Sequence, residues 1–247
     1  MHAVVERDGV RDEVAVEEPL EIRVDGAALA VTMRTPGHDE ELALGFLYGE
    51  GLIGPDLRMA GPSPDLANNV VDVAGPLRHD PGRRRFYTTS SCGVCGKGAL
   101  EEVAVHAPAV APGPVLARTL VATLPDRLQQ PGFARSGGLH ATGLFDAGGA
   151  LLCVREDVGR HNAMDKVVGR ALLDGALPLA GRLLCVSGRL SFELVQKAAV
   201  AGAPVLVGVG APTSLAVALA ADRGMTLAGF ARDRRVNVYT GTERIAD

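Results

Sequence analysis

Three short apolar runs in the last third of the chain decide the fold: Leu183-Leu184-Cys185-Val186, Pro204-Val205-Leu206-Val207 and Thr226-Leu227-Ala228-Gly229-Phe230. The segments between them, 190–201 and 214–223, have apolar residues at helical spacing. Near-continuous apolar strands that alternate with helices are typical of a largely parallel sheet with both faces covered. The sequence therefore predicts an α/β fold whose main sheet lies in the C-terminal half.

The segment upstream of these runs extends the same pattern. Leu144-Phe145 and Leu151-Leu152-Cys153-Val154 flank Asp146-Ala147-Gly148-Gly149, which predicts a hairpin. A helix is expected over 161–174, and a second helical pattern covers Val115 to Leu128.

The N-terminal part is expected to be smaller and rich in β-structure. Residues 1–35 alternate apolar and polar positions, with a hairpin signal at Asp25-Gly26. A helix is expected from Asp39 to Gly49 or Gly51, a loop over 55–69, and a short strand over 70–73. Because Ala111-Pro112-Gly113-Pro114 looks like a linker, we predict two regions, 1–110 and 111–247.

Composition excludes several classes of protein. The 247 residues are 47% hydrophobic, which is ample for a packed core. The net charge of −4 argues against a protein that coats nucleic acid. The first eight residues do not resemble a secretory signal, no apolar run is long enough to span a membrane, and four cysteines do not suit a disulfide framework. We therefore expect a soluble, cytoplasmic protein with reduced thiols and with no nucleic-acid or membrane partner.

The segment Ser90-Ser91-Cys92-Gly93-Val94-Cys95-Gly96-Lys97-Gly98 holds two thiols among three glycines. Such a segment favours an exposed loop, where thiols carry out sulfur transfer, dithiol redox chemistry or metal binding. Lys97 nearby would lower a thiol pKa. A structural zinc site needs four ligands, and Cys153 and Cys185 lie singly in apolar runs, as buried cysteines do.

Two loops between predicted strands and helices suit an anion. Val186 to Ser191 includes Ser187, Gly188 and Arg189, and Val207 to Ser214 includes Gly210. Free backbone N–H groups at helix starts, with glycines that allow close approach, bind phosphate groups. Because both loops follow parallel strands, a phosphate-bearing ligand is expected there. The alternative is that Ser191 and Ser214 are only helix N-caps.

Two further polar segments lie beside these loops in the sequence pattern. Glu156 to Lys166 places His161 and Asp165 on one helical face, either as ligand contacts or, with Asp157 or Asn162, as a hydrogen-bonded cap network. His140 is a further candidate for a residue that lines the ligand site. Three arginines in Phe230-Ala231-Arg232-Asp233-Arg234-Arg235 follow the last predicted strand, and they suit phosphate or guanine recognition or a plain surface.

Taken together, these segments resemble the FdhD family of formate dehydrogenase accessory sulfurtransferases. The resemblance is carried by Thr88 to Gly96, Glu156 to Lys166 and Ser187 to Glu193, with support from Gly210 to Thr213 and Gly229 to Thr240. The segments occur in order from about residue 86 to the C-terminus. The N-terminal third matches the family only in its length and in its general pattern of apolar and polar residues.

The resemblance implies a layered fold similar to cytidine deaminase, a homodimer, and sulfur transfer. Such proteins accept persulfide sulfur from a cysteine desulfurase and pass it to the molybdenum cofactor, bis(molybdopterin guanine dinucleotide), before formate dehydrogenase receives that cofactor. The persulfide carrier corresponds to Cys92, with Cys95 as the second thiol, and the cofactor-binding segment corresponds to Phe230 through Arg235. The zinc signature of the deaminases is absent from this sequence, so no permanent metal is expected.

Three other functions stay open on the residues alone. The chain would be a non-catalytic cofactor carrier if Cys92 and Cys95 only grip metal or a partner. It would be a structural zinc protein if those thiols found further ligands, or a dithiol reductase if they cycled as a disulfide.

Overall fold

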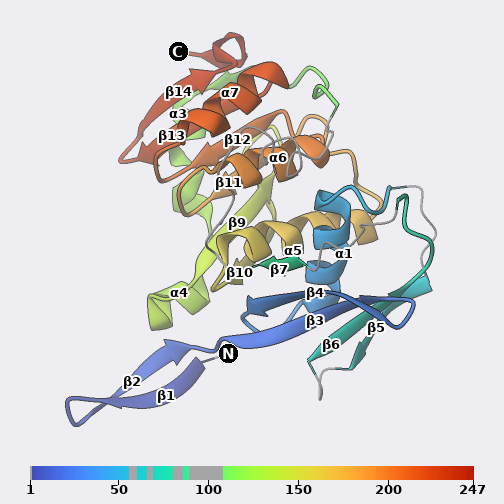
Figure 1. The fold of residues 1–247 in the computed structure, drawn as a ribbon. Helices are drawn as coiled ribbons and strands as arrows, with labels where there is room; N and C mark the ends of the chain where they lie inside the picture. Colours follow the sequence, from blue (N-terminus) through green and yellow to red (C-terminus); the bar gives the residue numbers. More distant parts are fainter. Residues whose placement is uncertain (1, 56–59, 66–68, 80–85, 89–107) are drawn as a thin grey trace.

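The computed structural model describes residues 2–55, 60–65, 69–79, 86–88 and 108–247. Its two larger sheets lie on either side of a layer of helices that contains α1 and α5 (Figure 1). Helix α3 covers the outer face of the larger sheet. Within the described part of the chain, no helix combines the length and the hydropathy that a membrane span requires.

The larger sheet has six strands in the order β10-β9-β11-β12-β13-β14. The bounds are β9 His140–Phe145, β10 Leu151–Asp157, β11 Leu183–Val186, β12 Val205–Gly208, β13 Thr226–Arg232 and β14 Arg235–Thr240. The predicted α/β class is confirmed, and the parallel pairings are those of the three central strands β11, β12 and β13. Strands β9, β10 and β14 pair antiparallel at the two sides.

The helices on this sheet follow the predicted pattern closely. They are α5 Arg160–Leu173, α6 Phe192–Val200 and α7 Ser214–Asp222. Ser191 caps α6 as predicted, but the cap of α7 is Thr213 and not Ser214. The predicted helix from 115 to 128 is wrong as a single element. It divides into β8 Leu116–Ala117, α3 Arg118–Thr123 and the 3₁₀ turn η1 Pro125–Arg127, because Pro125 lacks the N–H that a continuing helix needs.

Short elements complete this half. Helix α4 covers Pro131–Ser136 between η1 and β9. Near the C-terminus, a 3₁₀ turn η2, Thr242–Arg244, leads to β15, Ile245–Ala246, which pairs in parallel with β8. This pairing holds the C-terminus beside the start of α3, at the top of Figure 1.

The smaller sheet has five strands in the order β5-β6-β3-β4-β7. The bounds are β3 Glu18–Val24, β4 Ala27–Arg34, β5 Ala60–Asp65, β6 Val70–Ala74 and β7 Phe86–Thr88. The hairpin at Asp25-Gly26 is confirmed, and both residues have positive φ, as a tight turn of this kind requires. The predicted loop over 55–69 is wrong where β5 lies. Its two prolines are tolerated because β5 is an edge strand.

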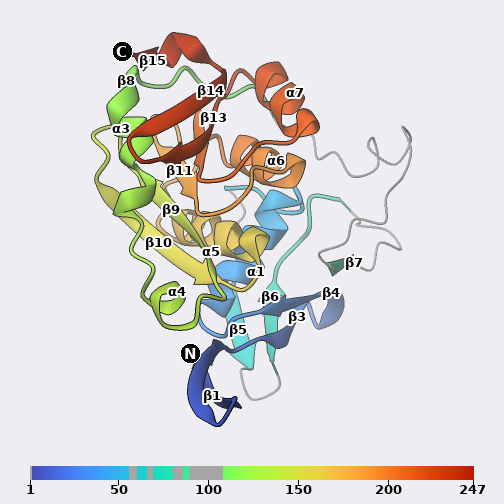
Figure 2. The same ribbon diagram turned by 90° about the vertical axis from the view of Figure 1, so that its left-hand side faces the viewer.

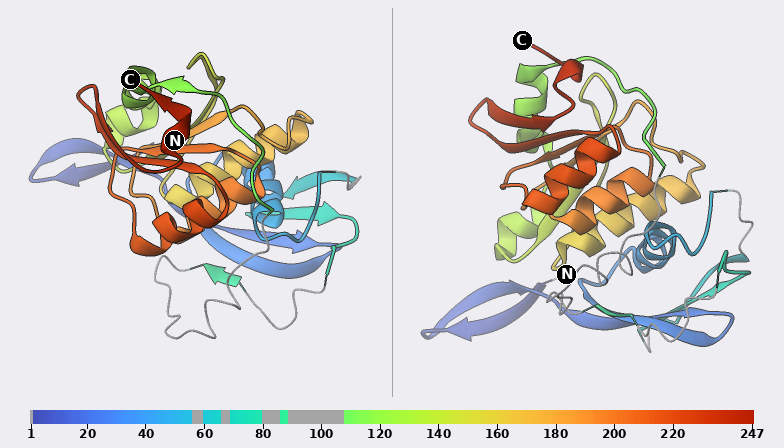
Figure 3. Two further views of the ribbon diagram at one scale, coloured as in Figure 1. Left: turned by 90° about the horizontal axis from the view of Figure 1, so that it is seen from above. Right: turned by 45° about the horizontal axis from the view of Figure 1, so that its top comes forward.

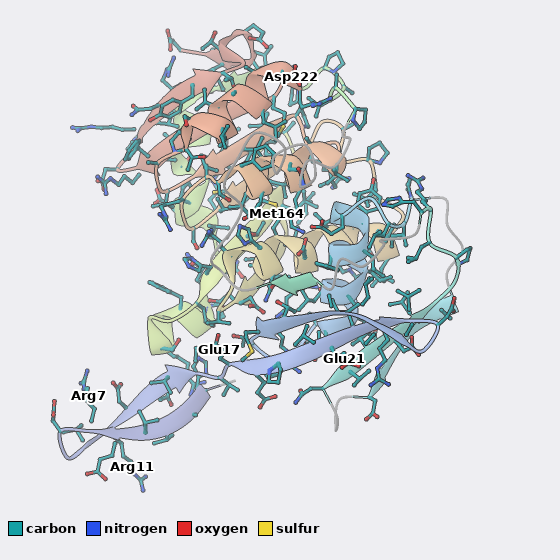
Figure 4. The ribbon with its side chains drawn as sticks, in the orientation of Figure 1. Arg7, Arg11, Glu17, Glu21, Met164 and Asp222 are labelled. Atoms are coloured by element: carbon teal, nitrogen blue, oxygen red, sulfur yellow. The ribbon has the colours of Figure 1, made fainter. Side chains whose placement is uncertain are left out.

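The first two strands form an arm. Strands β1, His2–Arg7, and β2, Val10–Ala15, pair with each other and with no other described strand, and they project from the body (Figure 3). Arg7 and Arg11 lie near the end of this arm (Figure 4). At its base, the arm contacts α4: the Arg135 guanidinium donates to Glu13 over 2.7 Å.

One hydrophobic cluster joins the two halves. It includes Leu20 and Ile22 of the smaller sheet, Met164 of α5, and Leu184 and Leu206 of the larger sheet. The predicted division at residue 110 stays a prediction, and the core extends across it.

Glycines allow helix α1, Asp39–Gly49, to cross α5 at very short distance. A Cβ on Gly45 would lie 1.8 Å from the Asp165 carbonyl oxygen, and a Cβ on Gly169 would lie 1.8 Å from that of Glu41. Any larger residue at either position would force the two helices apart.

Candidate functional site

The carboxyl ends of β11, β12 and β13 meet at one edge of the larger sheet, which faces the viewer in Figure 2. We call the loops 187–191 and 208–213 and the hairpin 229–235 the carboxyl edge. Hydrogen bonds hold these loops together: Gly210 N donates to Gly188 O over 3.0 Å, Leu190 N to Ala211 O over 3.0 Å, and Phe230 N to Gly210 O over 3.2 Å. The two loops that sequence reasoning assigned to anion binding are therefore one continuous surface.

The arginine-rich segment occupies a different place from the one predicted. Phe230 to Arg235 do not follow the last strand of the sheet, because they form the hairpin between β13 and β14. Asp233 and Arg234 have positive φ at its tip. Arg232, Asp233, Arg234 and Arg235 are all exposed, whereas Ala231 is fully buried in the core against α3. The hairpin thus presents three cations, while Ala231 only packs.

Phe230 has a strained backbone. Its φ is 54°, which a bulky residue adopts only when its surroundings hold it there, and the bond from its N–H to Gly210 O is one such restraint. The residue is 38% exposed. An exposed aromatic ring beside three arginines offers a stacking surface for a planar base.

Positive groups continue along the edge. The pKa of His140 lies below its usual value, first because burial disfavours the imidazolium and then because the charges of Arg160, His161 and Arg189 are close. The Nε of Arg160 is buried and has no hydrogen-bond acceptor within the described ranges. A hydrogen bond to strand β9 fixes the side chain of Ser187, whose Oγ accepts from Ala141 N over 2.9 Å.

His161 stands at the start of α5, beside the cap of α6. Its Nε2 lies 2.8 Å from Glu193 Oε2 and 3.3 Å from Ser191 Oγ. Sequence reasoning found His161 but missed Glu193 and Arg160. Their signal is only that each stands at the start of a helix: Arg160 begins α5, and Glu193 lies in the first turn of α6.

The rest of the polar segment turns inward and forms a hydrogen-bonded network, but the prediction that Asp157 or Asn162 caps the helix is wrong, because the N-cap of α5 is Gly159 and no side chain bonds there as a cap. Asp157 is fully buried and accepts from Gly159 N over 2.8 Å and from Asn162 Nδ2 over 3.1 Å. Its other oxygen lies 2.7 Å from Lys166 Nζ. Asp165 does not join His161. It pairs with Lys197 of α6 over 2.9 Å, and burial raises its pKa to about 6.

This network also forms hydrogen bonds with the end of β4. Asn162 Nδ2 donates to Met33 O over 2.7 Å, and Asn162 Oδ1 accepts from Thr32 Oγ1 over 3.1 Å. Lys166 Nζ donates to Thr35 O over 2.8 Å. We call Asp157, Asn162 and Lys166, with Thr32, Met33 and Thr35, the β4 clamp. Sequence reasoning gave no sign that the polar segment would reach the smaller sheet, because the contacts span about 130 positions.

The thiol segment connects to this clamp through β7. Cys92 and Cys95, with Lys97, lie outside the described residues. Strand β7 precedes them and pairs in parallel with β4, with Thr88 opposite Thr32. Cys92 comes four positions after Thr88, and four residues span at most about 14 Å.

The two described cysteines belong to the core. Cys185 is fully buried in β11, and Cys153 is partly buried in β10. Burial raises the pKa of both thiols, which makes them poor nucleophiles. In the part of the chain that the structure describes, no group of three or more His, Cys, Asp or Glu side chains is arranged to hold a metal ion.

Curated relatives match nearly the whole chain. The sulfur carrier protein FdhD of Streptomyces avermitilis is 52% identical over 256 residues, which covers 95% of this chain and 89% of that protein. The sulfur carrier protein FdhD of Mycolicibacterium paratuberculosis is 53% identical over 253 residues, with 95% and 92% covered, and that of Mycobacterium tuberculosis is 51% identical over 254 residues with the same coverage.

A solved structure agrees with these relatives. The crystal structure of a putative formate dehydrogenase accessory protein from Desulfotalea psychrophila matches with a TM-score of 0.79 and 28% identity, covering 100% of this chain and 98% of that one. The sequence profile of the FdhD/NarQ family matches residues 15–246. The chain therefore belongs to the FdhD/NarQ family.

Proposed function

We propose that this protein is a sulfur carrier that accepts persulfide sulfur from a cysteine desulfurase. It transfers that sulfur to the molybdenum cofactor, bis(molybdopterin guanine dinucleotide), which formate dehydrogenase then receives. Its relatives are named as sulfur carriers, and its structural neighbour as a formate dehydrogenase accessory protein, which supports the first and last parts of this proposal.

One observation carries the proposal. The strand that leads to Cys92 and Cys95 pairs with β4, and β4 is clamped to the start of α5, which lies at the carboxyl edge. Cys92 is therefore within about 14 Å of Thr88, which lies opposite Thr32, and Thr32 bonds to Asn162, the residue that follows His161. A carrier needs this proximity between its reactive thiol and the surface that holds the acceptor.

The carboxyl edge suits the proposed acceptor. The cofactor carries phosphates and guanine bases, and the edge offers exposed arginines at 189, 232, 234 and 235 together with the exposed ring of Phe230. Arginine binds phosphate by paired hydrogen bonds, and an aromatic ring stacks on a base. Ser187, Gly188, Gly210 and His161 line the same edge.

The sulfur chemistry balances without a permanent metal. The Cys92 thiolate attacks the outer sulfur of the donor's persulfide, the donor S–S bond breaks, and the donor thiolate leaves. Cys95 is then either the next carrier or the resolving thiol. As the resolving thiol it attacks the inner sulfur of the Cys92 persulfide, releases sulfide to the cofactor, and leaves a disulfide that a cellular thiol reductant reopens.

The test is to load the reduced protein with a cysteine desulfurase and cysteine and to weigh the peptide that contains Cys92 and Cys95. One added sulfur that reductant removes is expected, and Cys92→Ala should abolish it. Cys153→Ser is the matched control, because that thiol is partly buried and poorly nucleophilic, and it should load normally. A protein that gains no sulfur from a working desulfurase would overturn the proposal.

The alternative function is that of a non-catalytic carrier of the same cofactor. The carboxyl edge is assembled without any cysteine, and this observation favours the alternative. Cys92→Ala and Cys95→Ala variants decide between the two. A variant that binds the cofactor but leaves formate dehydrogenase inactive in cells points to sulfur transfer. A variant that keeps full activation points to carriage alone.

On the family resemblance we further propose that the protein is a cytoplasmic homodimer. The mass of the purified protein in solution tests whether it is a dimer.

A further inference from the structure

The end of β4 is held more elaborately than a strand end needs to be. Residues 32, 33 and 35 all bond to one segment of the C-terminal half, through a hydroxyl, a carbonyl and both backbone groups of Thr35. Thr35 N donates to Asp157 Oδ2 over 3.1 Å, and Val158 N donates to Thr35 Oγ1 over 3.2 Å. These bonds fix both the position and the rotation of the strand end relative to α5.

The clamp is also deeply buried. Asp157 is 0% exposed, Lys166 is 1% exposed and Thr32 is 6% exposed. Buried polar groups are costly, and a set of apolar side chains would join two elements at least as strongly. What a hydrogen-bonded network adds is a single defined geometry, because each bond tolerates only a narrow range of distance and angle.

Strand β7 depends on β4 for its position. Within the described sheet, β7 is an edge strand whose one partner is β4, with Ala30 opposite Phe86 and Thr32 opposite Thr88. Thr88 is the last described residue before the thiols. A displacement of β4 at Thr32 is therefore passed directly to the point from which the thiol segment departs.

We propose that Asn162 is a positioning residue for sulfur transfer. Through its bond to Thr32 it sets the end of β4, and with it the departure point of the thiol segment, relative to the carboxyl edge, which the preceding residue, His161, contacts at Ser191. This inference rests on the proposed function. Asn162 touches neither sulfur nor cofactor in this role, and it acts through β4 and β7 alone.

The proposal separates two steps that share the same thiols. Loading with sulfur takes place between the thiols and a donor protein, so it needs no fixed relation between the thiols and the carboxyl edge. Delivery to a ligand on that edge does need one, and a misplacement of about 1 Å costs on the order of 100-fold in such steps. Loss of the Asn162–Thr32 bond should therefore slow delivery and spare loading.

Thr32→Val is the sharpest test, because it removes the hydroxyl and keeps the shape and strand preference of the side chain. Each variant is expressed in cells that lack the native protein. Persulfide on Cys92 is measured by mass spectrometry of the isolated protein, and formate dehydrogenase activity is measured in the same extract. Thr32→Val should load within twofold of the unaltered protein but activate at least about tenfold less. Thr32→Ser, which restores the hydroxyl, should recover activation.

Thr226→Val is the matched control. Thr226 is also fully buried and bonded through its hydroxyl, to Gly241 O over 2.9 Å, but it begins β13 at the opposite edge of the sheet. Equal losses of activation in Thr32→Val and Thr226→Val, or a parallel loss of loading in Thr32→Val, would overturn the inference and leave the clamp a purely structural contact. Failure of the unaltered protein to load would instead overturn the proposed function itself.

Discussion

The carboxyl edge and the contact between α1, α5 and α6 are both rich in charged side chains, but these side chains are exposed at the edge and buried in the helix contact. At the edge, Arg189, Arg232, Arg234 and Arg235 are exposed, and none forms an ion pair among the described residues. In the helix contact, Lys197 is 6% exposed and lies between Asp165 and Glu50, at 2.9 and 3.5 Å. Exposed, unpaired charges attract a ligand, whereas buried pairs fix how elements sit together.

The same contrast occurs within the first two turns of α5. His161 faces the edge, and Asn162 and Lys166 face the smaller sheet. One short segment therefore contributes to both the carboxyl edge and the β4 clamp, which explains its high density of polar residues. Changes on the inward side should cost stability, and changes on the outward side should cost binding.

The largest effect is expected where a buried pair is broken. Lys166→Met leaves the Asp157 carboxylate buried without its cation, which costs about 3 to 5 kcal/mol of unfolding free energy. Urea titration followed by circular dichroism measures it. The double variant Lys166→Met with Asp157→Asn removes the stranded charge and should recover at least half of the loss. A double variant no more stable than the single one would show that the pair matters for more than its charge.

The next effect tests the close approach of α1 and α5. Gly169→Ala places a Cβ 1.8 Å from a backbone oxygen of α1, so the helices must separate, at a cost of about 3 kcal/mol. Gly175→Ala is the control. It has nothing within 4 Å and costs only about 1 kcal/mol, through its positive φ of 65°. Equal losses in urea unfolding would mean that the helix crossing relaxes freely.

These two regions also differ in how far sequence reasoning reached. The carboxyl edge was predicted, because apolar strands, glycine-rich loops and helix caps are local signals. The bonds from the clamp to β4 and the packing of α1 on α5 were not predicted, because they join residues more than 100 positions apart. One signal was present in composition: only three residues are lysine, and the two described ones, Lys166 and Lys197, are buried in ion pairs. In an arginine-rich chain, the retained lysines mark positions where a compact cation is needed.

The strand β5 and the divided helix at 115–128 were mispredicted for a related reason. The prolines in β5 oppose a strand locally, and only its place at the sheet edge permits one. Leu116 fits a helical pattern, but its pairing with Ile245 recruits it into a strand. In both cases a partner distant in sequence outweighs local preference.

An acid titration probes the pairing of Glu41 with Arg155. Burial works to raise the pKa of Glu41, but hydrogen bonds and charge from Arg155, with a smaller part from His38, hold it at about 2, below its usual 4.5. The unfolded chain thus binds the extra proton between pH 4.5 and 2, and stability from these contacts, on the order of 2 to 3 kcal/mol, is lost as pH falls through that window.

Arg155→Met should remove this contribution, so that unfolding free energy near neutral pH falls and its dependence on pH between 4.5 and 2 flattens. Arg170→Gln is the control, since its pair with Asp174 is exposed and should contribute less than about 0.5 kcal/mol. A wild-type slope that survives in Arg155→Met would place the acid sensitivity elsewhere. Asp165 cannot produce that slope, because its pKa is raised to about 6 and its share of the stability therefore falls as pH rises from 4 to 6.

The smallest effect on stability, and the clearest on binding, is expected at Arg189. Arg189→Gln removes one exposed cation, so unfolding free energy should change by less than about 0.5 kcal/mol. Affinity for a guanine nucleotide should fall about tenfold, as loss of one phosphate contact implies. Since Arg189 helps to lower the pKa of His140, NMR titration should show that pKa rising toward its usual value. Arg7→Gln, on the distant arm, should alter neither the nucleotide affinity nor the pKa of His140. A nucleotide affinity that falls equally in both variants would mean that net charge, and not the carboxyl edge, attracts the ligand.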